Sequence, residues 1–303
     1  MGISKQTNSA WVQMKLCPNC GSSRFEFSGA CPACGIAPRE TSGFVELAPE
    51  LAAQSSGFKV EYFEQLASVE ARNFWFRARN RLISWVATRF MRPGSNFCEV
   101  GCGTGYVLAG LAKSFPSVDF SATEIYSDAL SFASARVPSA SLYQMDARSI
   151  PFSAEFDTMG IFDVLEHIEE DEAVLREMHR ALKPHGSLLI TVPQHPSLWS
   201  QQDEQVCHVR RYTRDEMYRK LADAGFRVVF ATSFVSLLFP AMYWSRRRVR
   251  VEDAEYDMTA DLRLSAPVNA LMAAVMGIEF ALIRLGMRFS FGGSILIAAQ
   301  KEN

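Results

Sequence analysis

The sequence predicts an α/β fold in which helices cover both faces of a mostly parallel sheet. From Phe97 onward, short apolar runs alternate with amphipathic stretches of helical period, a pattern typical of parallel sheets. The first apolar run leads directly into three glycines in five positions, Gly101, Gly103 and Gly105. A strand that turns through such a loop into a helix is typical of nucleotide-binding sheets. The 303 residues suffice for one large domain with smaller additions.

The composition is that of an ordinary globular protein. Hydrophobic residues make up 48% of the chain and charged residues 21%, and the formal net charge of −2 gives no general affinity for nucleic acid. The N-terminal stretch MGISKQTNSA lacks the apolar core of a signal peptide, so we expect a cytoplasmic protein. Of seven cysteines, four form two tight N-terminal pairs, which favours a metal site over a disulfide framework.

Two Cys-Pro-x-Cys-Gly units stand in residues 17–35, CPNCGSSRFEFSGACPACG. Each unit can direct two thiolates at one metal, because its glycine permits a tight turn. Four thiolates in a tetrahedron are the ligand set of structural zinc, and the paired units resemble a zinc ribbon, with a small strand at RFEF. Reduced cysteines without metal, or iron in place of zinc, are the alternatives. We expect a ribbon domain of residues 1–40 that binds structural Zn²⁺ through Cys17, Cys20, Cys31 and Cys34.

Two segments separate this ribbon from the first strand. Residues 36–57, IAPRETSGFVELAPELAAQSSG, are predicted to form a linker. We assign this linker and the start of an N-terminal helical cap to residues 41–70. Residues 70–86, EARNFWFRARNRLISWV, are predicted to form an amphipathic helix with its apolar side towards the sheet.

Strands and helices then alternate to the end of the core. The expected strands span residues 96–100, 118–123, 141–145, 156–162, 187–192, 227–234 and 294–300. The expected helices between them span residues 106–115, 126–136, 171–182 and 213–224.

The glycine loop favours a cationic ligand over a dinucleotide. Dinucleotide loops read G-x-G-x-x-G, whereas this loop reads G-x-G-x-G, and Glu99 precedes its first glycine by two residues. A carboxylate at this place is unsuited to a pyrophosphate and well suited to a cation. S-adenosylmethionine carries an ammonium and a sulfonium and no phosphate, so it is the cofactor that we predict.

Four motifs together resemble the class I S-adenosylmethionine-dependent methyltransferases, in a type 11/12-like subgroup. E-x-G-C-G-T-G, an acidic residue closing the second strand, Met-Asp-Ala after the third and FDVLEHI after the fourth occur in this order within about residues 70–235. The resemblance implies a methyltransferase enzyme with a Rossmann-like, seven-stranded, mostly parallel sheet. It places the cofactor-binding core at residues 71–235.

The resemblance also implies roles for particular residues. The backbone of the three loop glycines passes the methionine part of the cofactor, Glu124 binds both ribose hydroxyls and Asp146 accepts from the adenine amino group. A helix cap is the structural alternative for Asp146, as core packing is for Phe162. The expected cofactor-binding residues are Glu99, Gly101, Cys102, Gly103, Gly105, Glu124, Ile125, Asp146, Ala147, Phe162, Asp163, Trp75 and Arg77.

The last two residues come from the helix at 70–86, which resembles the H-W-W-F-x-x-R helix of one methyltransferase subgroup. Asn73 stands where that subgroup has His. Trp75 with Arg77 and Arg79 is expected to cover the cofactor and bind its carboxylate. Plain packing of an amphipathic helix on the sheet is the alternative.

Residues for the acceptor are expected after strands four and five. If the acceptor is an alcohol, phenol or amine, a base must remove its proton, and the candidate catalytic residues are His208 and His167. The segment HVRRYT at 208–213 resembles the H-x-R-R-Y segment of the subgroup, which implies that Arg210, Arg211 and Tyr212 bind an anionic acceptor. Structural roles are the alternative: a hydrogen bond that anchors the loop for His208, and packing beneath the cofactor for His167.

The C-terminal region, residues 236–303, is expected to form an apolar helical lid and a final antiparallel strand. Residues 228–244 and 269–287 are strongly apolar, yet Pro240 interrupts the first and Glu279 and Arg284 the second, so neither is a clean membrane span. The apolar surface beside RRRVR also fits peripheral contact with an anionic membrane, or an acceptor with a greasy body.

The sequence therefore predicts a methyltransferase for a small-molecule acceptor. Oxygen is the preferred acceptor atom, before nitrogen or carbon, in a secondary metabolite, a saccharide or a lipid- or quinone-like molecule. The alternative is an RNA methyltransferase whose ribbon grips RNA, although Arg24 is the one basic residue in 17–35 and RNA affinity needs many phosphate contacts. A cofactor-binding protein without activity is the third hypothesis.

Overall fold

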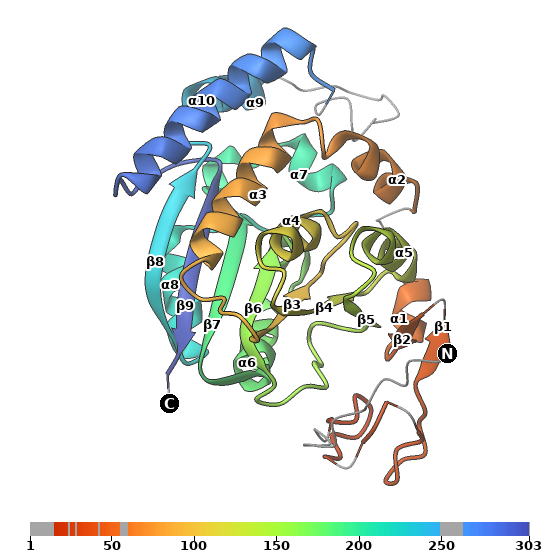
Figure 1. Cartoon of the computed structure of the whole chain (residues 1–303). Helices are drawn as coiled ribbons and strands as arrows, with labels where there is room; N and C mark the ends of the chain where they lie inside the picture. The colour runs from red at the N-terminus through yellow and green to blue at the C-terminus, as the bar shows by residue number, and fades with distance from the viewer. Residues whose placement is uncertain are drawn as a thin grey trace, which may run out of the picture.

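The structure is a computed structural model that describes residues 15–302, apart from residues 24, 28, 42, 55–59 and 249–262. Within this part of the chain a nine-stranded sheet forms the centre, in the order β1-β2-β5-β4-β3-β6-β7-β9-β8 (Figure 1). The strands are β1 Arg39–Thr41, β2 Phe44–Glu46, β3 Asn96–Val100, β4 Asp119–Glu124, β5 Ser141–Gln144, β6 Phe156–Phe162, β7 Leu182–Pro193, β8 Phe226–Phe234 and β9 Ser294–Lys301.

All seven predicted strands are confirmed, as β3 to β9. Pairing is parallel from β5 to β7, and β9 enters between β7 and β8 antiparallel to both. The carboxyl ends of β3, β4, β5, β6 and β7 therefore meet at one edge of the sheet, where ligands bind in open α/β folds.

The expected number of seven strands is too small, because β1 and β2 add to the edge of the sheet. They lie in the segment that the composition predicts as a linker. β2 pairs in parallel with β5, with Val45 opposite Tyr143, and Phe44 is buried in the core. Strands of three residues carry no readable alternation, so the contact with β5 rather than the local pattern makes them strands.

Helices cover both faces of the sheet, as predicted (Figure 1). In α6 the buried Val174, Leu175 and Met178 form one apolar stripe, and Asp171 and Glu172 stabilise the first turn through the helix dipole. One face carries α3 Phe74–Ala87, α4 Tyr106–Ser114, α5 Ser127–Arg136 and α10 Ala266–Arg284, and the other α6 Asp171–Ala181 and α8 Arg214–Asp223. The remaining helices are α1 Pro49–Gln54, α2 Val60–Val69, η1 Leu165–His167, η2 Pro196–Leu198, α7 Gln201–Gln205 and α9 Phe239–Arg248.

The N-terminal cysteine segment docks on the loop that follows β5. The backbone N–H of Leu16 donates to the carbonyl of Pro151 over 2.8 Å, and the Phe27 ring contacts the rings of Tyr143 and Phe152. The strand expected at RFEF is reduced to a single antiparallel bridge between Lys15 and Phe25. Arg24 lies outside the described residues.

Candidate active site

The glycine loop joins β3 to α4 at the carboxyl edge of the sheet. Gly101, Gly103 and Gly105 have φ angles of 69°, 50° and 74°, in the left-handed region that favours glycine. A side chain at position 101 would meet Val164 at 2.5 Å, so this glycine lets the loop pack against the end of β6. At Gly103 an added Cβ meets nothing within 4 Å, so a ligand can approach the backbone there.

Glu124 closes β4 and is hydrogen-bonded to this loop. The Gly103 and Ile125 backbone N–H groups each donate to its carboxylate over 2.8 Å, and the N–H of Tyr126 donates over 3.3 Å. Glu124 is buried, which raises its pKa, whereas these three backbone donors lower it. The carboxylate is thereby held in one orientation beside the glycine backbone.

Glu99, one residue before the end of β3, is a second buried carboxylate under the loop. It is 2% exposed, and its Oε2 atom has no hydrogen-bond partner among the described residues. Burial raises its pKa to about 8, with a lowering contribution from Arg79 and a further raising one from Glu124. An unsatisfied buried carboxylate oxygen is stabilised by a nearby cation, so the site fits a cationic ligand. The thiol of Cys102 is buried in the core beside it, and burial raises its pKa.

Asp146 follows β5 and is engaged locally. Its carboxylate accepts from the backbone N–H of Arg148 over 2.8 Å and pairs with the Arg148 guanidinium at 2.9 Å. Arg148 also pairs with Glu170 at 3.1 Å. These contacts stabilise the turn through Ala147. Residues 145–155, which are all described, contain no helix, so Asp146 is not a helix cap, while an adenine contact remains a prediction.

Arg79 of α3, rather than Arg77, points into the site. Its guanidinium pairs with Asp163, which follows β6, and lies 4.6 Å from the centre of the Trp75 ring. Thr191 donates to the same Asp163 carboxylate over 3.0 Å. Residues two apart on a helix differ by about 200° around its axis, which leaves Arg77 exposed on the opposite side. Phe162, the last residue of β6, is buried in the core.

A buried hydrogen-bond and ion-pair network, which sequence reasoning missed, holds the glycine loop in place. Thr104 donates to the Glu70 carboxylate over 2.7 Å, and Arg136 of α5 pairs with Glu70 at 2.8 Å. Asn73, in the place of the motif's His, is the N-cap of α3 and accepts from the N–H of Trp75. The N-cap signal of Asn was readable from sequence, whereas Glu70 carried none because its partners are distant in the chain.

The two predicted catalytic histidines meet at the end of the sheet. The ring centres of His167 and His208 are 4.7 Å apart, and His208 Nε2 lies 3.9 Å from Glu166 Oε1. The pKa of His167 is lowered to about 4, chiefly by burial and also by the neighbouring His208. Burial raises the pKa of Glu166, which is 1% exposed.

Asp203 of α7, which sequence reasoning also missed, orients His208. Its Oδ1 atom lies 2.9 Å from His208 Nδ1 and accepts from Arg211 Nε over 2.7 Å. Ser200 donates to the other oxygen from its backbone and its hydroxyl, in a capping box. The S-x-x-D pattern of that box was the available sequence signal.

The three predicted acceptor-binding residues all have protein partners. Arg211 is buried against Asp203, and Arg210 pairs with Asp171 at 3.0 Å. Tyr212 is fully buried, and its hydroxyl donates to the carboxylate of Asp171 over 2.8 Å. This segment therefore anchors the loop after β7 to η1 and α6.

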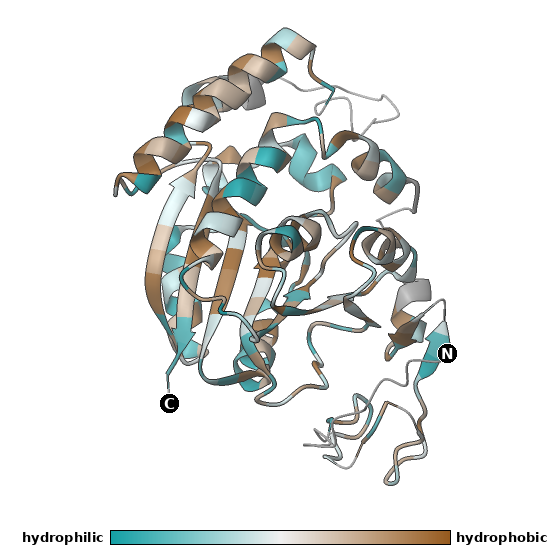
Figure 2. Cartoon of the chain, in the orientation of Figure 1, coloured by the Kyte–Doolittle hydropathy of each residue, from teal (hydrophilic) through white to brown (hydrophobic). Residues whose placement is uncertain are grey.

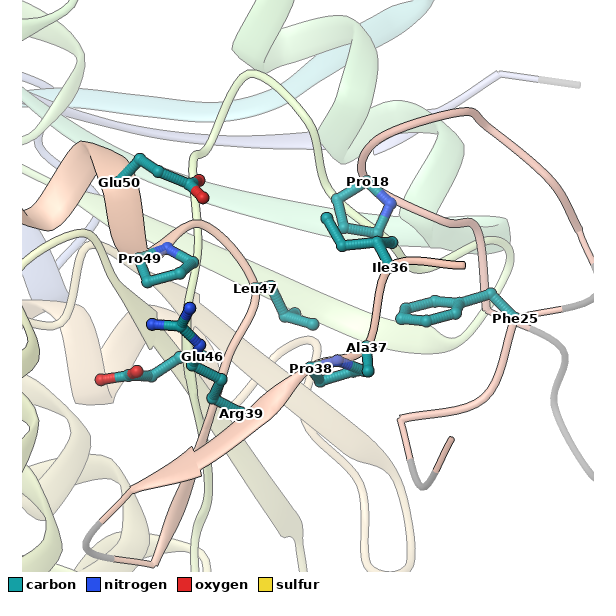
Figure 3. A pocket seen from close by; sticks show the side chains of 10 residues that line it. All are labelled: Pro18, Phe25, Ile36, Ala37, Pro38, Arg39, Glu46, Leu47, Pro49 and Glu50. Carbon is teal, nitrogen blue, oxygen red and sulfur yellow. The ribbon is translucent and has the colours of Figure 1, made fainter. Parts of the chain in front are cut away.

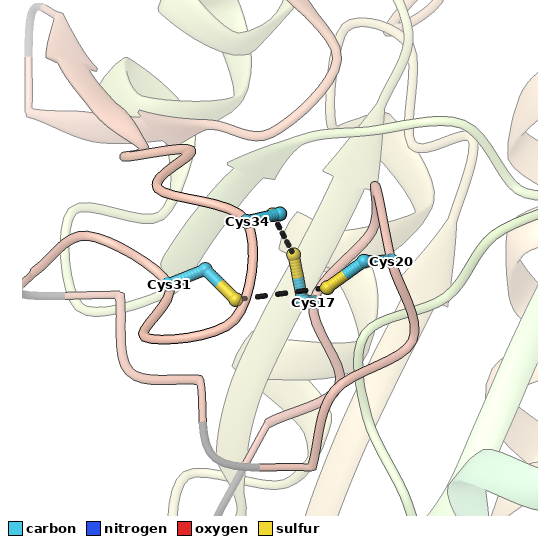
Figure 4. A group of neighbouring side chains, drawn as sticks. All are labelled: Cys17, Cys20, Cys31 and Cys34. Atoms are coloured by element: carbon cyan, nitrogen blue, oxygen red, sulfur yellow. Dashed lines mark hydrogen bonds between the residues drawn. The ribbon is translucent and has the colours of Figure 1, made fainter.

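The four N-terminal cysteines converge on one point (Figure 4). Sulfur–sulfur distances are 3.6 Å between Cys17 and Cys34 and 3.7 Å between Cys20 and Cys31. Thiolates about 2.3 Å from one zinc lie about 3.8 Å apart in a tetrahedron. The arrangement therefore fits structural zinc, with all four positions filled by sulfur.

A small pocket lies between this cysteine segment and β2 with α1 (Figure 3). Pro18, Phe25, Ile36, Leu47 and Pro49 give it a largely apolar lining. None of the residues that line it belongs to the glycine loop, so it is separate from the candidate active site.

The order of the strands, the glycine loop and the acidic residues at the strand ends are together typical of one class of protein, the methyltransferases. Residues 70–230, more than half of the chain, match the family described as methyltransferase domain, and the chain belongs to that family. The predicted resemblance to the class I S-adenosylmethionine-dependent methyltransferases is thus confirmed.

Individual relatives agree. A probable S-adenosylmethionine-dependent methyltransferase of Mycobacterium tuberculosis is 27% identical over 167 residues, which cover 53% of this chain and 58% of that protein. Malonyl-acyl-carrier-protein O-methyltransferase of Priestia megaterium is 26% identical, over 37% of this chain and 42% of that protein. The chain thus spans about half the length of the curated relatives that it matches.

A solved structure agrees on the fold. The complex of the Haloferax volcanii Trm112 methyltransferase activator with a methyltransferase gives a TM-score of 0.52 at 17% identity, covering 79% of this chain and 97% of that one. At this identity the likeness concerns the fold alone.

Proposed function

We propose that the chain transfers the methyl group of S-adenosylmethionine to a small-molecule acceptor, with oxygen the preferred acceptor atom. The observation that carries this proposal is the pair of buried carboxylates, Glu99 and Glu124, under a glycine loop with open space at Gly103. One carboxylate suits a cationic ligand and the other a vicinal diol, and the cofactor contains both.

Each side chain then has a defined part in cofactor binding. Glu99 balances the positive charge of the ligand. Glu124 gives up hydrogen bonds from backbone N–H groups and accepts hydrogen bonds from the ribose hydroxyls instead. Asp146 with Ala147 contacts the adenine, while Trp75 and Arg79 with Asp163 close the site from α3. When bound, the cofactor supplies a methyl group on a sulfonium, so the protein chiefly positions the acceptor in line with it.

Acceptor deprotonation is the task that we assign to His208 and His167. Asp203 holds the His208 ring with Nε2 directed towards Glu166 and His167, close to the end of β6. Val164, which packs against Gly101, connects this cluster to the glycine loop. The name of the Priestia relative, an O-methyltransferase, supports oxygen as the acceptor atom.

Zinc in the ribbon has a structural part in this proposal. Cys17 and Cys31 are buried in the same hydrophobic core cluster as Phe152, whose ring contacts that of Tyr143. The metal site is therefore part of the domain packing. Through Leu16 and Pro151, the ribbon supports the loop that also carries Asp146. We infer that zinc keeps this loop in place and takes no part in methyl transfer.

A peripheral contact between α10 and an anionic membrane completes the proposal. Among the described residues, α10 is the one helix long and apolar enough to cross a bilayer. However, its Glu279 is buried and accepts from the backbone N–H groups of Val235, Ser236 and Leu237, which docks α10 on the domain.

Hydrophobic residues predominate along α10 (Figure 2), and most of this helix is not buried. Leu271 is 62% exposed, Ile278 57% and Leu285 85%, and the cationic Arg284 and Arg288 are exposed at the C-terminal end of the helix, next to Leu285 in the chain. An apolar strip beside positive charge suits the interface of an anionic bilayer.

The RNA methyltransferase alternative has less support. Lys15 of the ribbon pairs with Glu155 instead of facing a ligand, and Arg210 and Arg211 pair with carboxylates. RNA binding depends on many unpaired cations that contact phosphates.

Calorimetric titration of the full chain with S-adenosylhomocysteine tests the cofactor assignment. One molecule per chain with micromolar affinity, about −8 kcal/mol, is the expected result. NAD⁺ is the control ligand and is expected not to bind. A folded chain that binds NAD⁺, or that does not bind S-adenosylhomocysteine, would contradict the proposal. Salt-sensitive binding of structured RNA would favour the alternative.

A further inference from the structure

Three side chains with metal-binding atoms converge beside the candidate active site. Glu166 and His167 lie in η1, directly after β6, and His208 follows α7. One ligand atom from each lies within 4.8 Å of the others. Ligands about 2.0–2.2 Å from one cation lie about 3–4 Å apart, so an approach of about 1 Å would complete a site.

The His208 ring is oriented towards Glu166. Asp203 Oδ1 lies 2.9 Å from His208 Nδ1, and the same carboxylate accepts from Arg211 and twice from Ser200, so it is held in place behind the ring. The other ring nitrogen, Nε2, lies 3.9 Å from Glu166 Oε1. A carboxylate behind a metal-binding histidine is the usual outer-shell partner of such a ligand.

Glu166 supplies an independent indication. The residue is 1% exposed, and its Oε2 atom has no hydrogen-bond partner among the described residues. The two buried arginines that act on it have other partners: Arg79 pairs with Asp163, and Arg211 donates to Asp203 and to the carbonyl of Gln194. A buried carboxylate with one free oxygen costs free energy unless a cation reaches it.

We propose that Glu166, His167 and His208 bind one divalent transition-metal cation, distinct from the ribbon zinc, that activates the acceptor. Two imidazoles and one carboxylate suit Zn²⁺, Mn²⁺ or Fe²⁺ and leave positions open for an acceptor oxygen. The inference rests on the proposed function and specifies how the histidines serve deprotonation.

The reaction step balances without a further co-reactant. The acceptor hydroxyl binds the cation, its pKa falls, and its proton passes to water. The oxygen then forms a bond to the methyl carbon while the carbon–sulfur bond breaks, which leaves neutral S-adenosylhomocysteine. His167 and His208 act as ligands in this step, so the acceptor class is one with a hydroxyl or carboxyl oxygen that can bind a metal.

Cobalt titration of the full, zinc-loaded chain is the test. The open site is first emptied with a mild chelator, which leaves the four-cysteine zinc in place, and Co²⁺ is added. We expect one Co²⁺ per chain with a visible spectrum that lacks thiolate charge-transfer bands, because its ligands are nitrogen and oxygen. Glu166→Gln and His167→Gln are each expected to weaken this binding at least about tenfold, and Asp203→Asn about tenfold.

His185→Gln, which changes an exposed histidine near the beginning of β7, is the matched control and is expected to bind Co²⁺ as wild type does. Circular dichroism verifies that each variant is folded. Two results would overturn the inference. One is that Co²⁺ does not bind, or binds only with thiolate bands; the other is that the folded Glu166→Gln and His167→Gln variants bind Co²⁺ as tightly as wild type does. S-adenosylhomocysteine titration on the same samples separates the two proposals: retained binding without Co²⁺ binding refutes the metal alone.

Discussion

The carboxylate of Glu124 lies 2.8 Å from the backbone nitrogen of Gly103, so the end of β4 and the centre of the glycine loop form one hydrogen-bonded unit. A ligand that approaches the open side of Gly103 therefore meets an oriented carboxylate at once. This relationship joins two motifs that are 21 residues apart in the chain.

Changing Glu124→Ala is expected to weaken binding of S-adenosylhomocysteine at least about tenfold, a loss of about 1.4 kcal/mol. The change removes the proposed ribose acceptor and also frees the N–H of Gly103. Asp119→Ala, at the exposed beginning of the same strand, is the matched control and should bind normally. Calorimetry measures both, and unchanged affinity in the Glu124 variant would refute the ribose assignment.

Glu99 predicts a pH dependence of stability. Its pKa in the folded protein is about 8, above the ordinary value of 4.5, so its protonated form is favoured by folding. The stability that this group contributes is complete below about pH 4.5 and is lost as the pH rises through about 8. Glu99→Gln removes this loss, so the variant should gain in Tm relative to wild type as the pH rises from about 5 to about 8.5.

The measurement is a pair of thermal melts of ligand-free protein across that pH range. Other buried carboxyls contribute to both proteins, so the difference between the two curves isolates Glu99. A difference that does not change with pH would show that Glu99 is ionised throughout. In the same variant, S-adenosylhomocysteine should bind more weakly, because the neutral amide cannot balance an ammonium.

Replacing Cys17 and Cys20 by Ser is expected to release close to one zinc per chain. Two of four thiolates are lost, and a structural zinc site needs all four ligands. Elemental analysis after gel filtration measures the metal. Cys207→Ser, an exposed cysteine outside the ribbon, should leave the zinc in place. Full zinc retention in the double variant would mean that the ribbon does not hold it.

Arg79→Ala and Arg77→Ala should differ in stability although the residues are two apart. Arg79 pairs with Asp163 in a largely buried position, and breaking such a pair leaves an unbalanced charge, at a cost of about 3 kcal/mol. Arg77 is exposed, and its removal should change the unfolding free energy by less than about 0.5 kcal/mol. Urea unfolding compares them, and equal effects would contradict the inward position of Arg79.

The outer side of α10 is expected to mediate membrane contact. Leu271→Glu combined with Ile278→Glu should abolish co-sedimentation with vesicles of anionic phospholipid, because both side chains are exposed on this strip. Val229→Glu introduces the same charge on the exposed part of β8 and is the control. If wild type fails to sediment with anionic vesicles, or sediments equally with the double variant, the membrane proposal is wrong.

The candidate site was readable from sequence where its signals are local. Gly101, Gly103 and Glu99 lie within five residues, and the strand ends at Glu124 and Asp163 follow from periodicity. Arg77 rather than Arg79 was placed among the expected cofactor-binding residues. The apolar Phe76 and Ile83, three residues before and four after Arg79, nevertheless indicate that Arg79 lies on the inward side of the helix. Tyr212 was expected at the acceptor and is instead buried against Asp171, because its environment comes from another element.

The sequence by itself determined the seven core strands, the glycine loop and the four-cysteine cluster, since each is encoded by neighbouring residues with a fixed period or spacing. Only the tertiary structure decided that β1 and β2 extend the sheet, that Asp203 orients His208 and that Glu70 joins Thr104 to Arg136. These relationships depend on side chains brought together by packing of separate elements. Burial and charge pairing are properties of that packing, which no local pattern contains.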